Sequence, residues 1–183
     1  MYLISAYFDN KTNNRIQGFM NRIAEKTGNT FMTQNHVPPH MTISSVEARD
    51  VEVLVPYISI LQNKLYQGRI QFVSVGMLFP YVMYVTPILN EYLLDLSQQI
   101  YDVIPKDPEI TVSNYYRPMQ WLPHITLAKK MSKEQMQTAF SIMQESFAPF
   151  EGEVTSIGLA KTNPHMDVIR YDLNQEKSKK YLT

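Results

Sequence analysis

One short pattern occurs twice in the sequence and limits what the chain can fold into. Proline, histidine, a hydrophobic residue, threonine and a second hydrophobic residue follow one another at residues 39–43 and again at residues 123–127. Polar and apolar residues that alternate with a period of two are typical of a strand with one buried face. Each segment therefore predicts a strand that presents a histidine and a threonine on one face and buries its hydrophobic residues on the other.

The surroundings of the two segments repeat as well. Their histidines, His40 and His124, lie 84 residues apart, and each is preceded by a predicted strand and helix and followed by a helix and strand. Gly76 follows His40 by 36 residues, and Gly158 follows His124 by 34 residues. A period of this length with only two copies is too long for a solenoid and indicates two lobes related by a pseudo-twofold axis. The two His/Thr strands are then expected to face each other across a cleft.

Hydrophobic periodicity and capping residues predict the remaining elements. Strands are expected at residues 2–8, 40–46, 69–78, 81–86, 154–160 and 168–173, in addition to the second His/Thr segment. Helices are expected from Asn13 or Asn14 to Gly28, from Asp50 to Gly68 with a start or bend at Pro56, from Asn90 to Ile104, and from Ser132 to Phe147.

These elements predict an α+β fold with a bilobal pseudo-twofold duplication, in which two antiparallel sheets flank a central cleft and helices lie on the outside. The chain 1–183 is expected to form a single two-lobed domain, with repeat halves at about 1–80 and 81–175 and a charged tail at 176–183.

Composition excludes some classes of protein. Lys and Arg total 17, as do Asp and Glu, so the net charge is zero, which argues against a protein that coats long nucleic acid. The absence of cysteine excludes disulfides, zinc-thiolate sites and thiol nucleophiles and suits a reducing cytosol. No apolar run is long enough to span a membrane. We expect a cytoplasmic protein without a membrane partner, and a monomer is favoured.

Two histidines and two threonines on facing strands suit phosphodiester chemistry. An unperturbed imidazole has a pKa near 6.5, so a histidine acts as a base or an acid at neutral pH. Of His40 and His124, one can take a proton from the nucleophile while the other gives one to the leaving group. The hydroxyls of Thr42 and Thr126 can donate to the non-bridging phosphate oxygens where charge builds up. This set of groups requires neither a metal nor a cofactor.

The segments His40-Met41-Thr42-Ile43 and His124-Ile125-Thr126-Leu127 resemble the paired motifs of the two-histidine phosphoesterase superfamily, which includes 2′,5′-RNA ligase-like proteins and cyclic nucleotide phosphodiesterases. The resemblance covers most of the chain, because the N-terminal strand, the motif spacing and the duplicated layout also agree. It implies a bilobal fold and a metal-independent phosphoric diester hydrolase. Its substrate would carry a 2′,3′-cyclic phosphate, a 2′-5′ phosphodiester or a related cyclic phosphate.

The charge of the chain departs from one feature of that superfamily. RNA-processing members often carry a basic groove, whereas this chain is neutral overall. Lys129 and Lys130 follow the second motif and Arg117 precedes it, which leaves room for a small local positive site. We therefore expect a nucleotide or an RNA terminus as the substrate.

Residues outside the motifs leave alternatives open. An aromatic and basic cluster before the second motif either contacts the substrate, because bases stack on aromatic rings and guanidinium planes, or closes over the core. Tyr7 on the first strand faces either the cleft or the core. His36 is interpreted as a surface or rim residue and His165 as a turn residue, and no metal site is expected. The cluster consists of Tyr115, Tyr116, Arg117 and Trp121.

Two other classes of function compete with a phosphodiesterase. A non-catalytic protein could use the same cleft to bind a nucleotide or cyclic phosphate, and ligand-induced stabilisation without turnover would identify it. A structural partner-binding protein would be unaffected by alanine at both histidines, and no sequence feature favours this class.

Overall fold

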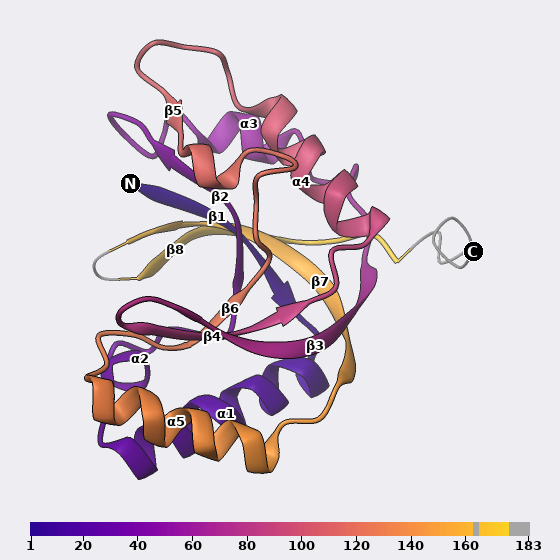
Figure 1. The fold of residues 1–183 in the computed structure, drawn as a ribbon. Helices are drawn as coiled ribbons and strands as arrows, with labels where there is room; N and C mark the ends of the chain where they lie inside the picture. The colour runs from indigo at the N-terminus through magenta and orange to yellow at the C-terminus, as the bar shows by residue number, and fades with distance from the viewer. Residues whose placement is uncertain (163–164, 176–183) are drawn as a thin grey trace.

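The computed structural model describes residues 1–162 and 165–175 and has helices on two sides of a sheet (Figure 1). The strands are β1 (Tyr2–Phe8), β2 (Met41–Glu47), β3 (Gly68–Leu78), β4 (Val82–Pro87), β5 (Thr111–Val112), β6 (Ile125–Ala128), β7 (Phe150–Lys161) and β8 (Met166–Asp172). The helices are α1 (Asn10–Thr27), α2 (Phe31–Gln34), α3 (Val55–Ser59), α4 (Glu91–Val103) and α5 (Lys133–Ser146), with a 3-10 turn η1 at Asn114–Tyr116. The tail predicted at 176–183 lies outside the described residues.

All named strands belong to one eight-stranded antiparallel sheet, so the prediction of two separate sheets is wrong. The strand order is β1-β2-β6-β4-β3-β7-β8, β5 pairs with β2, and β1 also pairs with β7. The path from β1 round to β7 is therefore closed. The physical reason is the length of β7, whose residues 150–154 pair with β3 and whose residues 154–161 pair with β1. Patterns within one strand contain no information on such long-range pairing.

The strand pairing relates the two halves of the chain. In this relation β1, β2 and β3 of the first half correspond to β4, β6 and β7 of the second half. The pair β1–β2 then corresponds to the pair β4–β6, and the pair β1–β7 corresponds to the pair β4–β3. The pairs β2–β6 and β3–β7 are unchanged by this exchange. The two motif strands are thus direct neighbours at the centre of the path, where each half meets the other.

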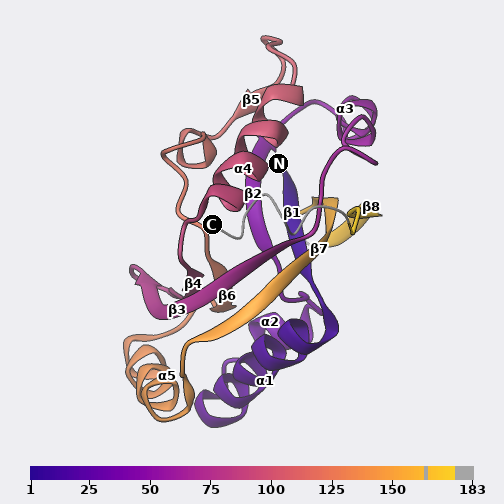
Figure 2. The same ribbon diagram turned by 90° about the vertical axis from the view of Figure 1, so that its right-hand side faces the viewer.

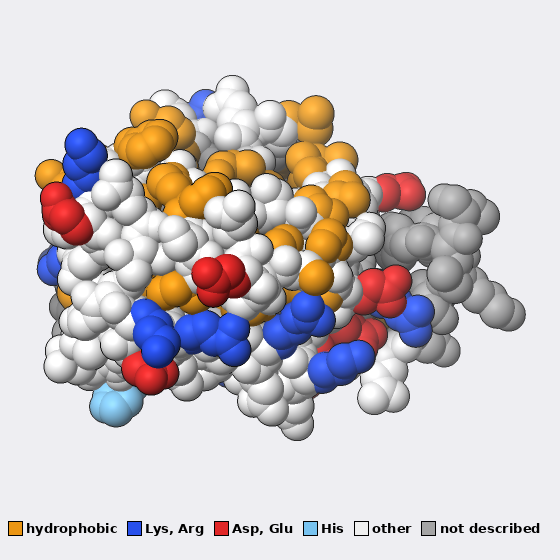
Figure 3. Space-filling model, turned by 60° about the horizontal axis from the view of Figure 1, so that its bottom comes forward, with side chains coloured by type: hydrophobic (Ala, Val, Ile, Leu, Met, Phe, Trp, Pro, Cys, Tyr) orange, Lys and Arg blue, Asp and Glu red, His pale blue; other side chains and the backbone are white. Residues whose placement is uncertain are grey.

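The helices form two groups at opposite ends of the sheet (Figures 1 and 2). One group contains α1, α2 and α5, and the other contains α3 and α4, with α1 packed on α5 and α3 on α4. From the side of α1 and α5, several Lys and Arg side chains lie in a row across the lower half of the view, with Asp and Glu side chains near them (Figure 3). Among the described residues, no helix is long and apolar enough to cross a membrane.

Helix boundaries differ from the prediction at two places. Helix α1 begins at Asn10, before the predicted Asn13 or Asn14, because the Asp9 carboxylate caps it by accepting hydrogen bonds from the backbone N–H groups of Lys11 and Thr12. Pro56 lies in the first turn of α3, which confirms a start there, although α3 ends at Ser59 and not at Gly68. The predicted caps Asn90 and Ser132 are confirmed.

Candidate active site

The two His/Thr segments lie side by side in the sheet. Strands β2 and β6 pair antiparallel with Met41 opposite Ile125, and both of these side chains are fully buried. Extension of this register places each histidine opposite the threonine of the other strand. Because residues directly opposite each other point to the same face, all four polar side chains share one face, as their alternation predicts. These side chains are His40, Thr42, His124 and Thr126, and all four line one pocket.

This pocket has a volume of about 610 Å³, which lies in the range of small-molecule sites. Its walls combine apolar and basic side chains with the four motif residues. The apolar part comes from Phe31, Met32, Val37 and Tyr116, and the basic part from Lys129 and Lys130. The lysine Nζ atoms lie 4.9 and 4.5 Å from the centre of the Phe31 ring. Burial, with a smaller contribution from Lys130, lowers the pKa of Lys129.

Both histidines are held in the same tautomer by the same local turn. The Nδ1 atom of His40 lies 2.8 Å from the carbonyl oxygen of Pro38, and Nδ1 of His124 lies 2.9 Å from that of Leu122. A carbonyl oxygen only accepts hydrogen bonds, so Nδ1 carries the proton in each ring. In the neutral ring, Nε2 therefore keeps its lone pair, and each histidine can accept a proton through this atom.

Burial keeps both imidazoles neutral near pH 7. It lowers the pKa of His40 to about 4, against the opposing effect of the hydrogen bond to Pro38. Burial also lowers the pKa of His124 from its ordinary value, and the hydrogen bond to Leu122 again opposes the shift. Each ring is thus a free base at neutral pH, and only one that gains a proton can serve as an acid.

A tyrosine lies against His124 and occupies the space above a glycine. The rings of Tyr84 and His124 are 5.3 Å apart between centroids. Tyr84 of β4 stands opposite Gly76 of β3, and a Cβ atom on Gly76 would overlap the Tyr84 ring. Gly76 is therefore the residue that gives Tyr84 its place beside His124.

The other half has a similar arrangement. Tyr7 of β1 lies with its ring 6.4 Å from that of His40, and a Cβ atom on Gly158 of β7 would approach Tyr7 Cε2 to 3.0 Å. Gly76 and Gly158 are the two glycines whose spacing from the histidines suggested the repeat. Each makes room for the tyrosine that packs against the histidine of one motif.

Comparisons with known proteins identify the family of the chain. The sequence matches the model of the 2′-5′ RNA ligase superfamily over residues 35–165. The chain belongs to this superfamily. The expected resemblance to two-histidine phosphoesterases is thereby confirmed. Among curated protein sequences, none matches the chain.

Solved structures resemble this superfamily member along nearly its whole length. TT0787 of Thermus thermophilus has a TM-score of 0.60 at 13% identity, covering 96% of this chain and 99% of that one. A phosphoesterase has a TM-score of 0.59 at 14% identity, covering 95% and 98%. E. coli LigT complexed with ATP has a TM-score of 0.54 at 12% identity, covering 95% and 97%. At such low identities the likeness establishes the fold alone.

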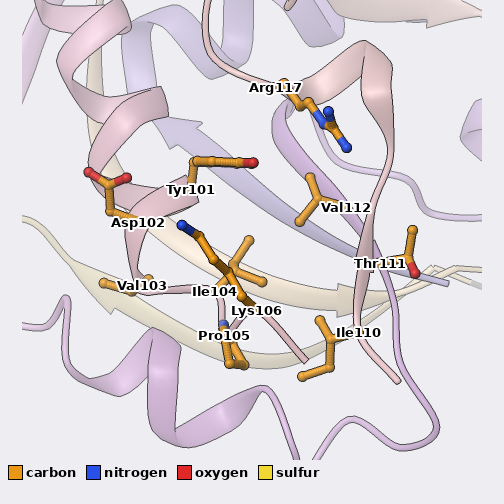
Figure 4. Close-up of a pocket in the computed structure, with 10 residues that line it drawn as sticks. All are labelled: Tyr101, Asp102, Val103, Ile104, Pro105, Lys106, Ile110, Thr111, Val112 and Arg117. Atoms are coloured by element: carbon orange, nitrogen blue, oxygen red, sulfur yellow. The ribbon is translucent and has the colours of Figure 1, made fainter. Parts of the chain in front are cut away.

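The aromatic and basic cluster of this 2′-5′ RNA ligase superfamily member does not act as one unit. Tyr116 lines the pocket, but Tyr115 is 82% exposed and does not. Trp121 is 5% exposed and its Nε1–H donates to the carbonyl oxygen of Thr42 at 2.9 Å, so it supports β2 from the core. Arg117 lines a separate cavity of about 710 Å³ that includes Tyr101 (Figure 4).

Sequence reasoning missed one histidine of the pocket. His165 does lie in a turn, as predicted, but its side chain also lines the pocket, with its ring 5.3 Å from that of His40. No local signal in the sequence indicates this position, because it depends on how β8 pairs with β7. His36, by contrast, is exposed, as its interpretation as a surface residue predicts. In the described part of this superfamily member, no three His, Asp or Glu side chains gather in a group that could hold a metal ion.

Proposed function

We propose that this protein is a metal-independent phosphodiesterase that acts on a 2′,3′-cyclic phosphate, a 2′-5′ phosphodiester or a related cyclic nucleotide. One observation carries the proposal: two adjacent strands present two imidazoles and two hydroxyls on the same face of one pocket. Membership of a superfamily of phosphoesterases and RNA ligase-like proteins supports the reaction class.

The proposed reaction is an in-line displacement at phosphorus. The Nε2 atom of one histidine takes a proton from water as the water oxygen bonds to phosphorus. The protonated Nε2 of the other histidine gives its proton to the leaving oxygen as the bond from phosphorus to that oxygen breaks. The hydroxyls of Thr42 and Thr126 donate to the non-bridging oxygens as their charge grows. The product is a phosphomonoester with a free hydroxyl, and the two histidines exchange roles in the reverse reaction, in which that hydroxyl displaces water from the phosphomonoester.

The walls of the pocket suit a nucleotide. Phe31 and Tyr116 line the pocket with aromatic surface against which a base can pack, and Lys129 and Lys130, whose Nζ atoms lie over the Phe31 ring, offer positive charge for phosphate. E. coli LigT, which shares the fold, has been crystallised with ATP, 3′-AMP and phosphate. The zero net charge favours a small nucleotide or an RNA terminus over long RNA.

Turnover assays with purified protein test the function. Incubation with 2′,3′-cyclic nucleotides and with 2′-5′-linked oligonucleotides, both in the presence of a chelator, is expected to release phosphomonoester products. Oligonucleotides of the same sequence with 3′-5′ linkages serve as the matched control and are expected to remain intact. Thermal stabilisation by the same compounds without turnover would instead identify a non-catalytic nucleotide-binding protein.

The pH dependence of kcat/KM is expected to be bell-shaped with an acidic optimum. The reaction needs one protonated and one neutral histidine, and this form of the free enzyme is most populated between the two pKa values. The pKa of His40 is about 4, and burial holds the pKa of His124 below 6.5. Between these limits kcat/KM should be greatest, and it should fall by about tenfold per pH unit on either side. An optimum above pH 7.5 would contradict the use of these two histidines as the acid and the base.

A further inference from the structure

The surroundings of the two motif histidines differ in one respect. Near His40, the Tyr7 hydroxyl donates to Asp167 Oδ1 at 2.8 Å. The same Oδ1 atom lies 3.2 Å from Nε2 of His165, but that nitrogen is buried and makes no hydrogen bond among the described residues. Near His124, Tyr84 makes no hydrogen bond through its hydroxyl within the described part of the chain. The pairing of the strands is alike in the two halves, but this polar network belongs to the His40 half.

His165 forms a wall of the pocket directly against His40. The two imidazole rings are 5.3 Å apart between centroids and are inclined by 31°. The side chain of His165 is 11% exposed, so it is packed within the protein and not free in solvent. Since Nδ1 of His40 is held by Pro38, contact with His165 restricts the remaining freedom of the His40 ring.

The network behind His165 is anchored in the sheet. Tyr7 lies on β1 and Asp167 on β8, and both strands pair with β7. The Arg170 guanidinium lies 3.8 Å from the centre of the Tyr7 ring, and its Nε–H donates to Ser156 Oγ at 3.0 Å. Tyr7 is 1% exposed. Movement of Asp167, beside which His165 packs, would therefore disturb contacts on three paired strands.

We propose that His165, packed beside Asp167 and against the His40 ring, is a positioning residue that keeps the His40 imidazole aimed into the pocket. The proposal rests on the phosphodiesterase function proposed above, which needs the Nε2 atom of His40 within hydrogen-bond reach of the substrate. Displacement of a catalytic group by about 1 Å can lower a rate by about 100-fold. A side chain that keeps the His40 ring in place should therefore have a large effect on kcat.

The same wall controls the protonation of His40. Charged and titratable groups reach this ring from several elements: Lys129 follows β6, Asp167 lies on β8, and His165 precedes β8. Burial is the main reason for the low pKa of His40, and the charge effects of His165 and Lys129 lower it further, whereas Asp167 raises it. Removal of the His165 ring admits water and removes one of these effects. Both changes raise the pKa of His40 toward its ordinary value.

Three variants test the positioning role. In His165→Ala, kcat is expected to fall by about 10- to 100-fold with little change in KM, and the acidic limb of the pH profile should move up from about 4. In His165→Phe, a ring again fills the wall, and kcat and the acidic limb should largely recover. The matched control is His36→Asn, because His36 is exposed with a φ of 49°, a left-handed conformation that asparagine tolerates. This variant should behave like the wild type.

Titration of His40 by NMR separates this inference from the proposed function. The His40 Cε1–H signal, assigned by its loss in His40→Gln, reports the pKa of His40 without any substrate. A higher pKa in His165→Ala and its return in His165→Phe support the inference, whether or not the wild type hydrolyses a phosphodiester. An unchanged titration in folded His165→Ala, as in His36→Asn, overturns it. Absence of turnover in the wild type, by contrast, counts against the function alone.

Discussion

Replacement of either His40 or His124 by asparagine is expected to lower kcat/KM by about 10²- to 10⁴-fold. Each substitution removes the Nε2 atom that moves a proton, while the side-chain amide retains a polar group in the pocket. The loss is measured with the best substrate found among the cyclic nucleotides and 2′-5′-linked oligonucleotides. The double variant should be scarcely worse than either single one, because the two groups act together in one step.

The control for these variants is again a histidine. His36→Asn changes the same side chain at an exposed position outside the pocket and should retain full activity. Circular dichroism and the thermal midpoint of each variant verify that the sheet remains intact. Full activity in folded His40→Asn or His124→Asn would exclude the two-histidine mechanism.

Addition of one methyl group at Gly76 is expected to damage both stability and activity. A Cβ atom there would overlap the ring of Tyr84, which must move, and Tyr84 lies 5.3 Å from His124. Overpacking of this kind destabilises a protein by about 1–3 kcal/mol. The displaced ring should also shift His124, and we expect kcat/KM to fall by about tenfold or more at a temperature where Gly76→Ala is folded.

Two further variants identify the cause of this effect. Gly18 lies within α1 with no heavy atom near its missing side chain, so Gly18→Ala should stabilise the protein by about 0.5–1 kcal/mol and leave activity unchanged. Combination of Gly76→Ala with Tyr84→Ala removes the overlap, so the stability costs of the two substitutions should not add. If the losses in the free energy of unfolding were additive, Gly76 would be needed for a reason other than making room for the Tyr84 ring.

The core of the site was predictable because its signal is local. A period of two decides which side chains of a strand share a face, and this placed His40 with Thr42 and His124 with Thr126. The repeated context then predicted that the two strands face each other across a cleft. That prediction is wrong in its geometry, because the strands are paired neighbours in one sheet, with Met41 opposite Ile125, and their polar side chains share one face.

The rest of the site depends on contacts between distant segments. Tyr116 and Arg117 are neighbours in sequence and were grouped together, but the turn at η1 directs them to different cavities. His165 reaches His40 only because β8 joins the sheet beside β7. The single sheet was likewise not predictable, since it arises from the pairing of β1 with the far end of β7. Hydrophobic patterns specify faces of strands but not their partners.

Closure of the strand path also restricts shifts in the register of the motif strands β2 and β6. β2 pairs with β1 on one edge and with β5 and β6 on the other, and β6 pairs with β4 on one edge and with β2, through Met41 and Ile125, on the other. A slip by one residue would turn the histidine and threonine of that strand into the core and Met41 or Ile125 into the pocket. Such a slip must break two ladders at once. A compact form with intact strands but a misaligned site is therefore disfavoured, and on denaturation the unmutated protein should lose its activity only together with the sheet.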